Sequence, residues 1–433
     1  MMQDHRKVLI ILCGAFVVTC FMYLFALPSY TGSHGFVSPL DEGVRQFSSL
    51  KAHTWEDTLI GKMTSGSDRV KSNSYTILQH ASSRLVFNEA ITKYWNPIDG
   101  VNMDLPFKYK SLTNYTVNGT KLIVFDNCPD WLRSSLKGKM KLCKYSNCLL
   151  SENRSMIAEA DAVLFNGKSI TPTPPTRTPG QVWVIFAWES PANLAHTMTT
   201  MHILKWRRVL NWTMTYRTDS DLFAPVGMFV PTLKLPSYHH LLNIVQRKTK
   251  AVAWFVSHCK TASRRMAYVE RLKKIIDVDV FGRCGPEECL KSSPECINML
   301  NHTYMFYLSF ENSLCKDYIT EKLYKTFNVP CVPIVRGGAD YKHLVPNGTY
   351  IDAADFSNPE SLGWHLKGLM SNTSAYMDIL MRKEQYRVFM SSHGKHMAFC
   401  ELCYRLNNPG TLWDTQTDVE KWKEECHAPR DLG

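Results

Sequence analysis

Tyr304-Met-Phe-Tyr-Leu-Ser-Phe310 is followed by Glu-Asn-Ser313 and then by Asp317-Tyr-Ile-Thr-Glu-Lys322. The first run is almost wholly apolar and aromatic, which predicts a strand buried on both faces of a sheet. The spacing from Ile319 to Phe327 predicts a helix, and Val332-Pro-Ile-Val335 predicts another strand. Strand, helix and strand in this order indicate a parallel sheet with a right-handed crossover.

The same alternation extends toward the N-terminus. The sequence predicts strands at 121–125, 162–165, 182–186, 251–256 and 278–281, helical stretches at 192–207 and 262–276, and a Thr/Pro-rich loop at 171–179. Two such blocks, which divide near residues 232–250, predict an α/β protein with two Rossmann-like domains that face a cleft. Ligands of such sheets bind beyond the carboxyl ends of the strands. The residues after Phe186, Val256 and Phe310 are therefore expected to carry the chemistry.

Composition places the chain among globular proteins, with 45% hydrophobic and 21% charged residues. The formal net charge of +11 suits an anionic partner. The Lys and Arg residues are scattered and interleaved with acids, so a nucleic-acid partner is not expected.

Residues 8–27 form an uncharged apolar segment long enough, at roughly 30 Å, to cross a bilayer as a helix. Arg6 and Lys7 precede it, and the next Lys or Arg is Arg45. The positive-inside rule then predicts a single-pass type II protein whose body is lumenal. A cleaved signal peptide is the alternative, although its apolar region is normally about 7–15 residues long. Residues 28–84, which lack sustained periodicity, are expected to form a stem.

Sequons and cysteines agree with a lumenal body. We expect glycosylation at Asn114, Asn118, Asn153, Asn301, Asn347 and Asn372, and a further sequon begins at Asn211. Cys400 and Cys403 have the C-x-x-C spacing of half a zinc site, but the sequence has no second C-x-x-C or paired His segment to complete it. We therefore expect these cysteines to form disulfide bonds. Their partners do not follow from spacing.

Glu189 comes directly after a predicted strand, in Trp188-Glu-Ser-Pro191. A carboxylate at that point can take a proton from an attacking hydroxyl as a general base. The simpler alternative is a helix-capping carboxylate or a solvated loop residue.

Lys322 lies where the predicted helix after residue 317 begins. A helix N-terminus and a lysine together suit a phosphate. Nearby, Glu321 could accept hydrogen bonds from a ribose and Tyr318 could stack on a base, while Arg264 and Arg265 could contact phosphates. The simpler alternative for Tyr318, Glu321 and Lys322 is an ordinary first helical turn with mixed charges. The simpler alternative for Arg264 and Arg265 is an exposed helix face.

Asp219-Ser-Asp221 has the D-x-D pattern with which many glycosyltransferases hold Mn²⁺. Three-residue patterns arise easily by chance, and Asp277-Val-Asp279 is another. A metal is possible here, but it is not expected to be essential.

The order of these segments resembles the Golgi α1,3-fucosyltransferases. The resemblance covers roughly residues 182–355, and a weaker similarity lies at 400–403. The matching motifs are Glu189-Ser-Pro191, 211–221, 278–282, 306–313, 317–322 and 332–335. Four positions depart from the usual pattern, at Val226, His258, Met305 and Pro330, and none removes a presumed catalytic group.

The resemblance implies a two-domain GT-B fold and an inverting reaction that requires no metal or other cofactor. The residues themselves predict a cytosolic tail at 1–7, a signal-anchor at 8–27 and a stem at 28–84. The resemblance implies that an acceptor-binding domain at 85–245 and a GDP-fucose-binding domain at 246–395 follow. Residues 396–433 would pack back on the N-terminal domain. The implied location is the Golgi membrane.

By motif position, the resemblance implies that Glu189 is the catalytic base. It implies that Arg265 and Lys322 contact the diphosphate of GDP-fucose, and that Asn312, Tyr318 and Glu321 surround the nucleotide. The acceptor would be a glycoprotein or glycolipid glycan. Two rival hypotheses are a metal-dependent transferase using Asp219 and Asp221, and a membrane protein that binds glycans without turnover.

Overall fold

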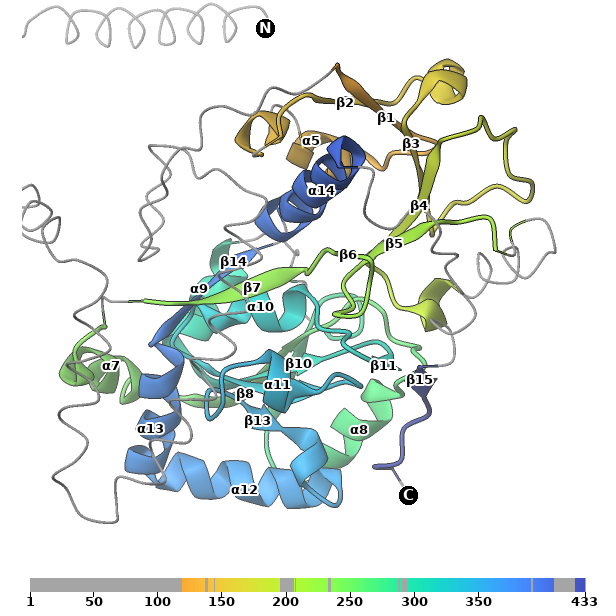
Figure 1. Cartoon of the computed structure of the whole chain (residues 1–433). Helices are drawn as coiled ribbons and strands as arrows, with labels where there is room; N and C mark the ends of the chain where they lie inside the picture. Colours follow the sequence, from red (N-terminus) through yellow and green to blue (C-terminus); the bar gives the residue numbers. More distant parts are fainter. Residues whose placement is uncertain are drawn as a thin grey trace, which may run out of the picture. The chain divides into compact units, whose positions relative to one another are not determined.

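The C-terminal half of the chain is built around the central strand β10. The computed structural model describes residues 119–432, except 137–138, 144, 195–205, 207, 233–234, 287–288, 290–293, 391 and 409–424 (Figure 1). All seven residues of β10, Tyr304–Phe310, are buried, as expected for a strand with both faces covered. It lies in a five-stranded parallel sheet of order β13 (Ile351–Asp352), β12 (Val332–Arg336), β10, β8 (Lys250–Phe255) and β9 (Val278–Phe281).

The preceding part of the chain forms another parallel sheet, which we call the first sheet, and the five-stranded sheet is the second sheet. The order of the first sheet is β2 (Cys148–Ser151), β1 (Lys121–Phe125), β3 (Ala162–Asn166), β4 (Val182–Ala187), β5 (Trp212–Thr215) and β6 (Leu222–Phe223). All six residues of β4 are buried. Two parallel sheets with intervening helices confirm the predicted α/β class.

Helices cover these sheets. They are α5 (Asp130–Leu136), α7 (Tyr238–Val245), α8 (Arg265–Leu272), α9 (Pro294–His302), α10 (Glu321–Phe327), α11 (Tyr341–Leu344), α12 (Pro359–Ser371), α13 (Thr373–Lys383) and α14 (Ser392–Asn407). The sequence determines some of their ends clearly: Asn358 and Ser361 form a capping box at the start of α12, with Pro359 in its first turn. Asn372 then caps α13 through a hydrogen bond from the Ala375 amide.

The two blocks share buried apolar side chains. One core cluster contains Phe165 and Trp183 from the first sheet together with Leu323 and Phe327 from α10. The antiparallel pair β7 (Gly227–Pro231) and β14 (Tyr386–Met390) also joins distant parts of the sequence. The described residues belong to one compact unit, 78–433, and the predicted division into domains near residue 245 stays a prediction.

Two helices are shorter than the sequence predicts. The predicted helix at 262–276 spans only Arg265–Leu272, because Arg264 adopts a left-handed conformation with φ 49° and blocks an earlier start. The predicted helix from Ile319 begins at Glu321, because Thr320 is extended and its amide donates to Glu311 instead. Of the predicted helix at 192–207, the described part contains a single 3₁₀ turn, Pro191–Leu194.

Cys400 and Cys403 both form disulfide bonds, but not with each other. Cys400 pairs with Cys143, and Cys403 pairs with Cys148. Together with Phe399, Leu402 and other buried residues of α14, these bonds hold the helix against the first sheet. The cluster Cys143, His396 and Cys400 has metal-ligand spacing, but the disulfide uses both sulfurs. The further disulfides are Cys259–Cys284, Cys289–Cys296 and Cys315–Cys426.

Among the sequons, Asn153, Asn347 and Asn372 are exposed and Asn301 is partly buried. The side-chain oxygens of Asn153 and Asn372 cap helical turns, which leaves the amide nitrogen as the atom for a glycan. Asn114, Asn118 and residues 8–27 lie outside the described residues. Among the residues described, no helix is long and apolar enough to cross a membrane.

Removal of the Cys143–Cys400 bond is expected to destabilise the folded protein. The neighbouring bond Cys148–Cys403 keeps almost the same loop closed, so the expected cost lies at the low end of the roughly 2–5 kcal/mol that loss of a native disulfide typically costs. The Cys143→Ser/Cys400→Ser variant should therefore unfold at a lower temperature in a thermal melt. Cys128→Ser is the control, since Cys128 is a free thiol. Equal melting temperatures for the double variant and the wild type would contradict this assignment.

Candidate active site

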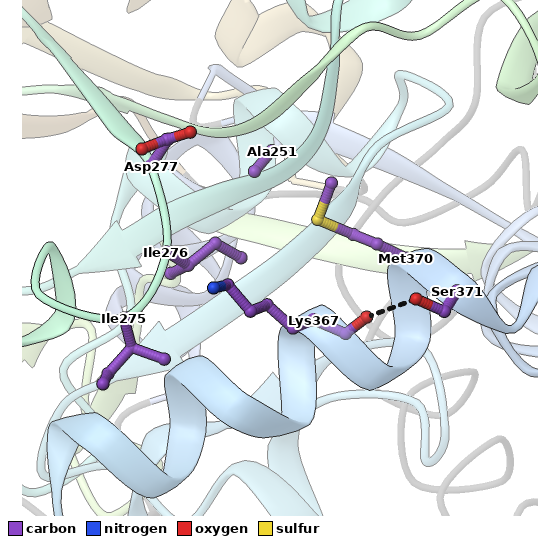
Figure 2. A pocket seen from close by; sticks show the side chains of 7 residues that line it. All are labelled: Ala251, Ile275, Ile276, Asp277, Lys367, Met370 and Ser371. Carbon is purple, nitrogen blue, oxygen red and sulfur yellow. Dashed lines mark hydrogen bonds between the residues drawn. The ribbon is translucent and has the colours of Figure 1, made fainter.

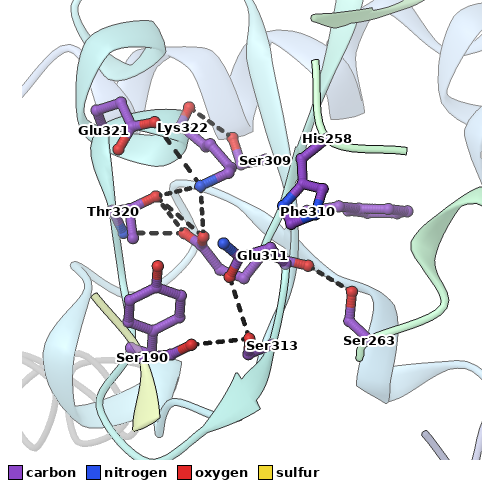
Figure 3. Close-up of polar contacts among 12 residues, drawn as sticks. Ser190, His258, Ser263, Ser309, Phe310, Glu311, Ser313, Thr320, Glu321 and Lys322 are labelled. Atoms are coloured by element: carbon purple, nitrogen blue, oxygen red, sulfur yellow. Dashed lines mark hydrogen bonds and ion pairs between the residues drawn. The ribbon is translucent and has the colours of Figure 1, made fainter. Parts of the chain in front are cut away.

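Polar side chains gather where strands β4, β8 and β10 end. Ser190, soon after β4, donates to Ser313 after β10, with 2.8 Å between the hydroxyl oxygens. Ser263, in the connection after β8, donates its hydroxyl to the Glu311 carbonyl at 2.7 Å. The carboxyl ends of strands from both sheets therefore meet around residues 310–313, which we call the 310–313 segment (Figure 3).

Glu189 lies beside this segment and is held by four hydrogen bonds. Its Oε1 atom accepts from the Tyr318 hydroxyl at 2.5 Å, the Ser190 amide at 2.9 Å, Asn193 at 3.1 Å and Asn312 at 3.4 Å. All four bonds reach the same oxygen, so they leave Oε2 for another proton donor. This is the arrangement that a positioned general base needs.

The pKa of Glu189 lies below its ordinary value. Burial acts to raise this pKa, but the hydrogen bonds from Tyr318, Asn193, Ser190 and Asn312 together outweigh burial. Glu189 is therefore ionised at neutral pH and able to accept a proton. Because its oxygen receives bonds from both sheet blocks, the simpler reading as a solvated loop residue does not fit.

Tyr318 is only 2% exposed. Its ring packs against Tyr216 with the ring centroids 5.0 Å apart, and its hydroxyl donates to Glu189. Burial and the Glu189 charge raise the pKa of the Tyr318 hydroxyl, so it stays protonated and keeps donating. The structure thus places Tyr318 beside the predicted base, while its predicted stacking on a nucleotide base stays a prediction.

Lys322 points to the buried carboxylate of Glu311 (Figure 3). The Lys322 Nζ atom lies 2.8 Å from Glu311 Oε2 and 2.7 Å from the Thr320 hydroxyl, which also contacts Glu311. Burial acts to lower the pKa of Lys322, but the charges of Glu311 and Glu321 and the hydrogen bond to Glu311 together outweigh burial and raise it, so the ammonium stays charged. Glu321, also in the first turn of α10, lies 3.7 Å from the same nitrogen.

Arg265 is almost fully buried rather than on an exposed helix face. Its guanidinium donates to the Phe310 carbonyl at 2.7 Å and to the His258 carbonyl at 3.0 Å. Its Nε–H group is also buried and has no acceptor in the described part of the chain. An unsatisfied buried donor is costly, and such exceptions deserve a functional explanation. The adjacent Arg264 is exposed.

The 310–313 segment therefore connects the predicted site residues. Phe310 binds Arg265, Glu311 binds Lys322, and Asn312 binds Glu189. Sequence reasoning assigned no role to Glu311 or Asn193. Glu311 is a charged residue directly after an almost wholly apolar strand, and that position could have marked it as a buried ion-pair partner.

Asp219 and Asp221 are engaged by the protein itself. Asp219 accepts from Arg217 at 2.7 Å and from Lys316 at 3.1 Å, and these bonds lower its pKa to about 2. Asp221 accepts from both the amide and the hydroxyl of Thr213 at 2.8 Å. These contacts explain the motif as part of the fold and do not favour a metal role.

A separate hollow lies where strands of the five-stranded sheet begin, opposite to the ends that carry the site residues (Figure 2). It is lined by Ala251, Ile275, Ile276, Asp277, Lys367, Met370 and Ser371. Ala251 is near the start of β8, and Asp277 directly precedes β9. The hollow is therefore distant from the carboxyl ends of the strands and from Glu189.

Comparisons with known proteins match both sheet blocks of the chain. Residues 245–422 match the model for glycosyltransferase family 10 (fucosyltransferase), C-terminal part, and residues 118–227 match the fucosyltransferase N-terminal model. The chain is 34% identical over 319 residues to alpha-(1,3)-fucosyltransferase C of Drosophila melanogaster, covering 68% of this chain and 72% of the relative. It is 33% identical over 287 residues to a human 4-galactosyl-N-acetylglucosaminide 3-alpha-L-fucosyltransferase, covering 64% and 72%.

Among solved structures, a crystal structure of an alpha1,3-fucosyltransferase with GDP-fucose matches 73% of this chain and 97% of its own, with a TM-score of 0.45 and 13% identity. The two family models together cover both sheet blocks. The chain therefore belongs to glycosyltransferase family 10 and is a member of the α1,3-fucosyltransferases.

Proposed function

We propose that this enzyme transfers L-fucose from GDP-β-L-fucose to the 3-hydroxyl of an N-acetylglucosamine residue in a glycan, with inversion at the anomeric carbon. The observation that carries the proposal is the 310–313 segment, which binds one ionised carboxylate and two cations. Asn312 binds Glu189, Phe310 binds Arg265 and Glu311 binds Lys322. Displacement of a nucleotide diphosphate by an alcohol requires both kinds of group.

In the proposed reaction, the acceptor hydroxyl attacks the anomeric carbon of fucose in line with the departing GDP. A C–O bond to the acceptor forms as the C–O bond to the diphosphate breaks, and the hydroxyl proton passes to Glu189. Oε2 is the suited oxygen, because the four bonds described above occupy Oε1. Asn193, Ser190 and Tyr318 hold the carboxylate in place.

Lys322 and Arg265 would stabilise the negative charge that develops on the leaving GDP. Glu311 keeps Lys322 charged and aligned before the donor binds. The buried Nε–H of Arg265 is a donor that a small movement could present to a phosphate oxygen. Asn312 and Glu321 would then face the nucleotide, as the family resemblance implies.

We further propose a GT-B arrangement and a single-pass type II location in the Golgi membrane, with residues 8–27 as the anchor. The support comes from the apolar segment preceded by basic residues, together with five disulfides and three exposed sequons among the described residues. Exposed Asn153, Asn347 and Asn372 are the suited glycan sites, and Asn301, Asn114 and Asn118 are further candidates.

Glu189→Gln should lower kcat by about 10²–10⁴-fold, because the amide keeps the shape of the side chain but cannot accept the proton. The measurement is fucose transfer from GDP-fucose to N-acetyllactosamine and N-glycan acceptors. GDP binding and the melting temperature serve as controls and should stay near those of the wild type. Wild-type turnover in the variant would refute Glu189 as the base.

Tyr318→Phe should raise the pKa of Glu189, since it removes the hydrogen bond that lowers this pKa most. Glu189 works as a base only when ionised, so activity is lost as pH falls through its pKa. The acidic limb of the kcat/KM profile should therefore move to higher pH in the variant. Asn193→Ala should move the limb in the same direction by a smaller amount. A limb that does not move would contradict the proposed role of Tyr318.

Lys322→Met/Glu311→Gln removes a buried ion pair without leaving either charge unpaired. The variant is therefore expected to fold, so that its GDP affinity can be measured. We expect GDP affinity, measured by calorimetry, to fall at least about tenfold, the size of one lost charge-assisted contact. A melting temperature close to that of the wild type would separate this loss from unfolding. Unchanged GDP affinity in the folded variant would exclude Lys322 from the diphosphate site.

A further inference from the structure

Residues 425–432, which we call the C-terminal tail, contact neighbours of the active site at two places, Lys316 near Tyr318 and Arg336 near Ser263. Strand β15 (Cys426–His427) pairs with β11 (Leu314–Cys315), and the disulfide Cys315–Cys426 fixes this pair covalently. The tail therefore begins directly beside the loop that carries Tyr318.

Glu425 anchors the first end of the tail. Its carboxylate lies 2.9 Å from Arg217 and 3.2 Å from Lys316, and its carbonyl accepts from the Lys316 amide. Asp317, next in the chain, has φ 57° and accepts from the amide and hydroxyl of Thr218. These contacts fix the turn that directs Tyr318 toward Glu189.

Asp431 anchors the other end. Its two oxygens accept from Nε and Nη2 of Arg336, at 2.6 and 2.8 Å. Arg336 is the last residue of β12 and is only 3% exposed, with its guanidinium 4.7 Å from the centre of the Tyr268 ring. A bidentate carboxylate fixes the plane of a guanidinium as well as balancing its charge.

Hydrogen bonds through Ser263 connect the Arg336 guanidinium to the 310–313 segment. Arg336 Nη1 donates to the Ser263 carbonyl at 2.9 Å. Ser263 is fully buried, and it donates its hydroxyl to the Glu311 carbonyl and its amide to the Asn312 carbonyl. Asp431 is thus connected through Arg336 and Ser263 to the backbone of the two residues that bind Lys322 and Glu189.

We propose that Asp431 is a positioning residue for the donor side of the active site, acting through Arg336 and Ser263 on the 310–313 segment. This inference rests on the proposed function, because it takes the neighbourhood of Lys322 and Arg265 as the GDP site. Without the Asp431 charge, the buried Arg336 lacks its counter-ion and draws away from Ser263 to regain a partner. The 310–313 segment then loses one of its supports.

The test compares Asp431→Asn with Asp431→Glu and Glu360→Gln in the full chain. Glu360 forms a similar bidentate pair with Arg271, at 2.8 and 2.7 Å. Arg271 also donates to the tail, at the Leu432 carbonyl, but not to Ser263. Glu360→Gln therefore controls for the loss of an Arg–carboxylate pair near the tail.

For Asp431→Asn we expect GDP affinity by calorimetry to fall, and KM for GDP-fucose to rise, by about tenfold, the equivalent of one charge-assisted bond. KM for the acceptor should stay near the wild-type value. Asp431→Glu should restore most of the donor affinity, and Glu360→Gln should leave it unchanged. A purely structural role would not raise KM for GDP-fucose while leaving KM for the acceptor unchanged.

Three results would overturn the proposal: unchanged GDP affinity in Asp431→Asn, an equal loss in Glu360→Gln, or an equal rise of both KM values. Wild-type enzyme that binds no GDP would instead refute the proposed donor site itself. The two failures are therefore distinguishable.

Discussion

The buried ion pair between Glu311 and Lys322 is the constraint on which the arrangement of the active site depends. Glu311 is 1% exposed, and a carboxylate at that depth requires a cation and hydrogen-bond donors around it. Lys322, the Thr320 amide and the Thr320 hydroxyl supply them. This requirement fixes the start of α10 at Glu321 and brings the lysine to the end of β10.

The same short segment also joins the two sheet blocks. Phe310, Asn312 and Ser313 contact Arg265, Glu189 and Ser190 respectively. Because these neighbours follow strands of different sheets, a displacement of the segment would move the predicted base and the predicted cations together. Inverting transfer needs these groups in a fixed relation, since small errors in position are costly to the rate.

Much of this could be predicted from local sequence. Strand β10 was predicted with its observed limits, because seven consecutive buried residues leave an unmistakable apolar run. Glu189 and Lys322 were predicted as site residues because each follows a strand and belongs to a motif, and their catalytic roles stay predictions. Helix starts were predicted less well, since the left-handed Arg264 and the bonds from Thr320 to Glu311 depend on tertiary contacts. The partners of Cys400 and Cys403 lie more than 250 residues away and leave no local signal.

A crystal structure of the enzyme with GDP would test the central claim most directly. The account predicts that the diphosphate lies against Lys322 and Arg265 at the carboxyl end of β10, with the Glu189 carboxylate facing the space where the sugar would attach. A diphosphate bound elsewhere, such as in the hollow where strands of the five-stranded sheet begin, would contradict the account. So would Glu189 facing away from the bound nucleotide.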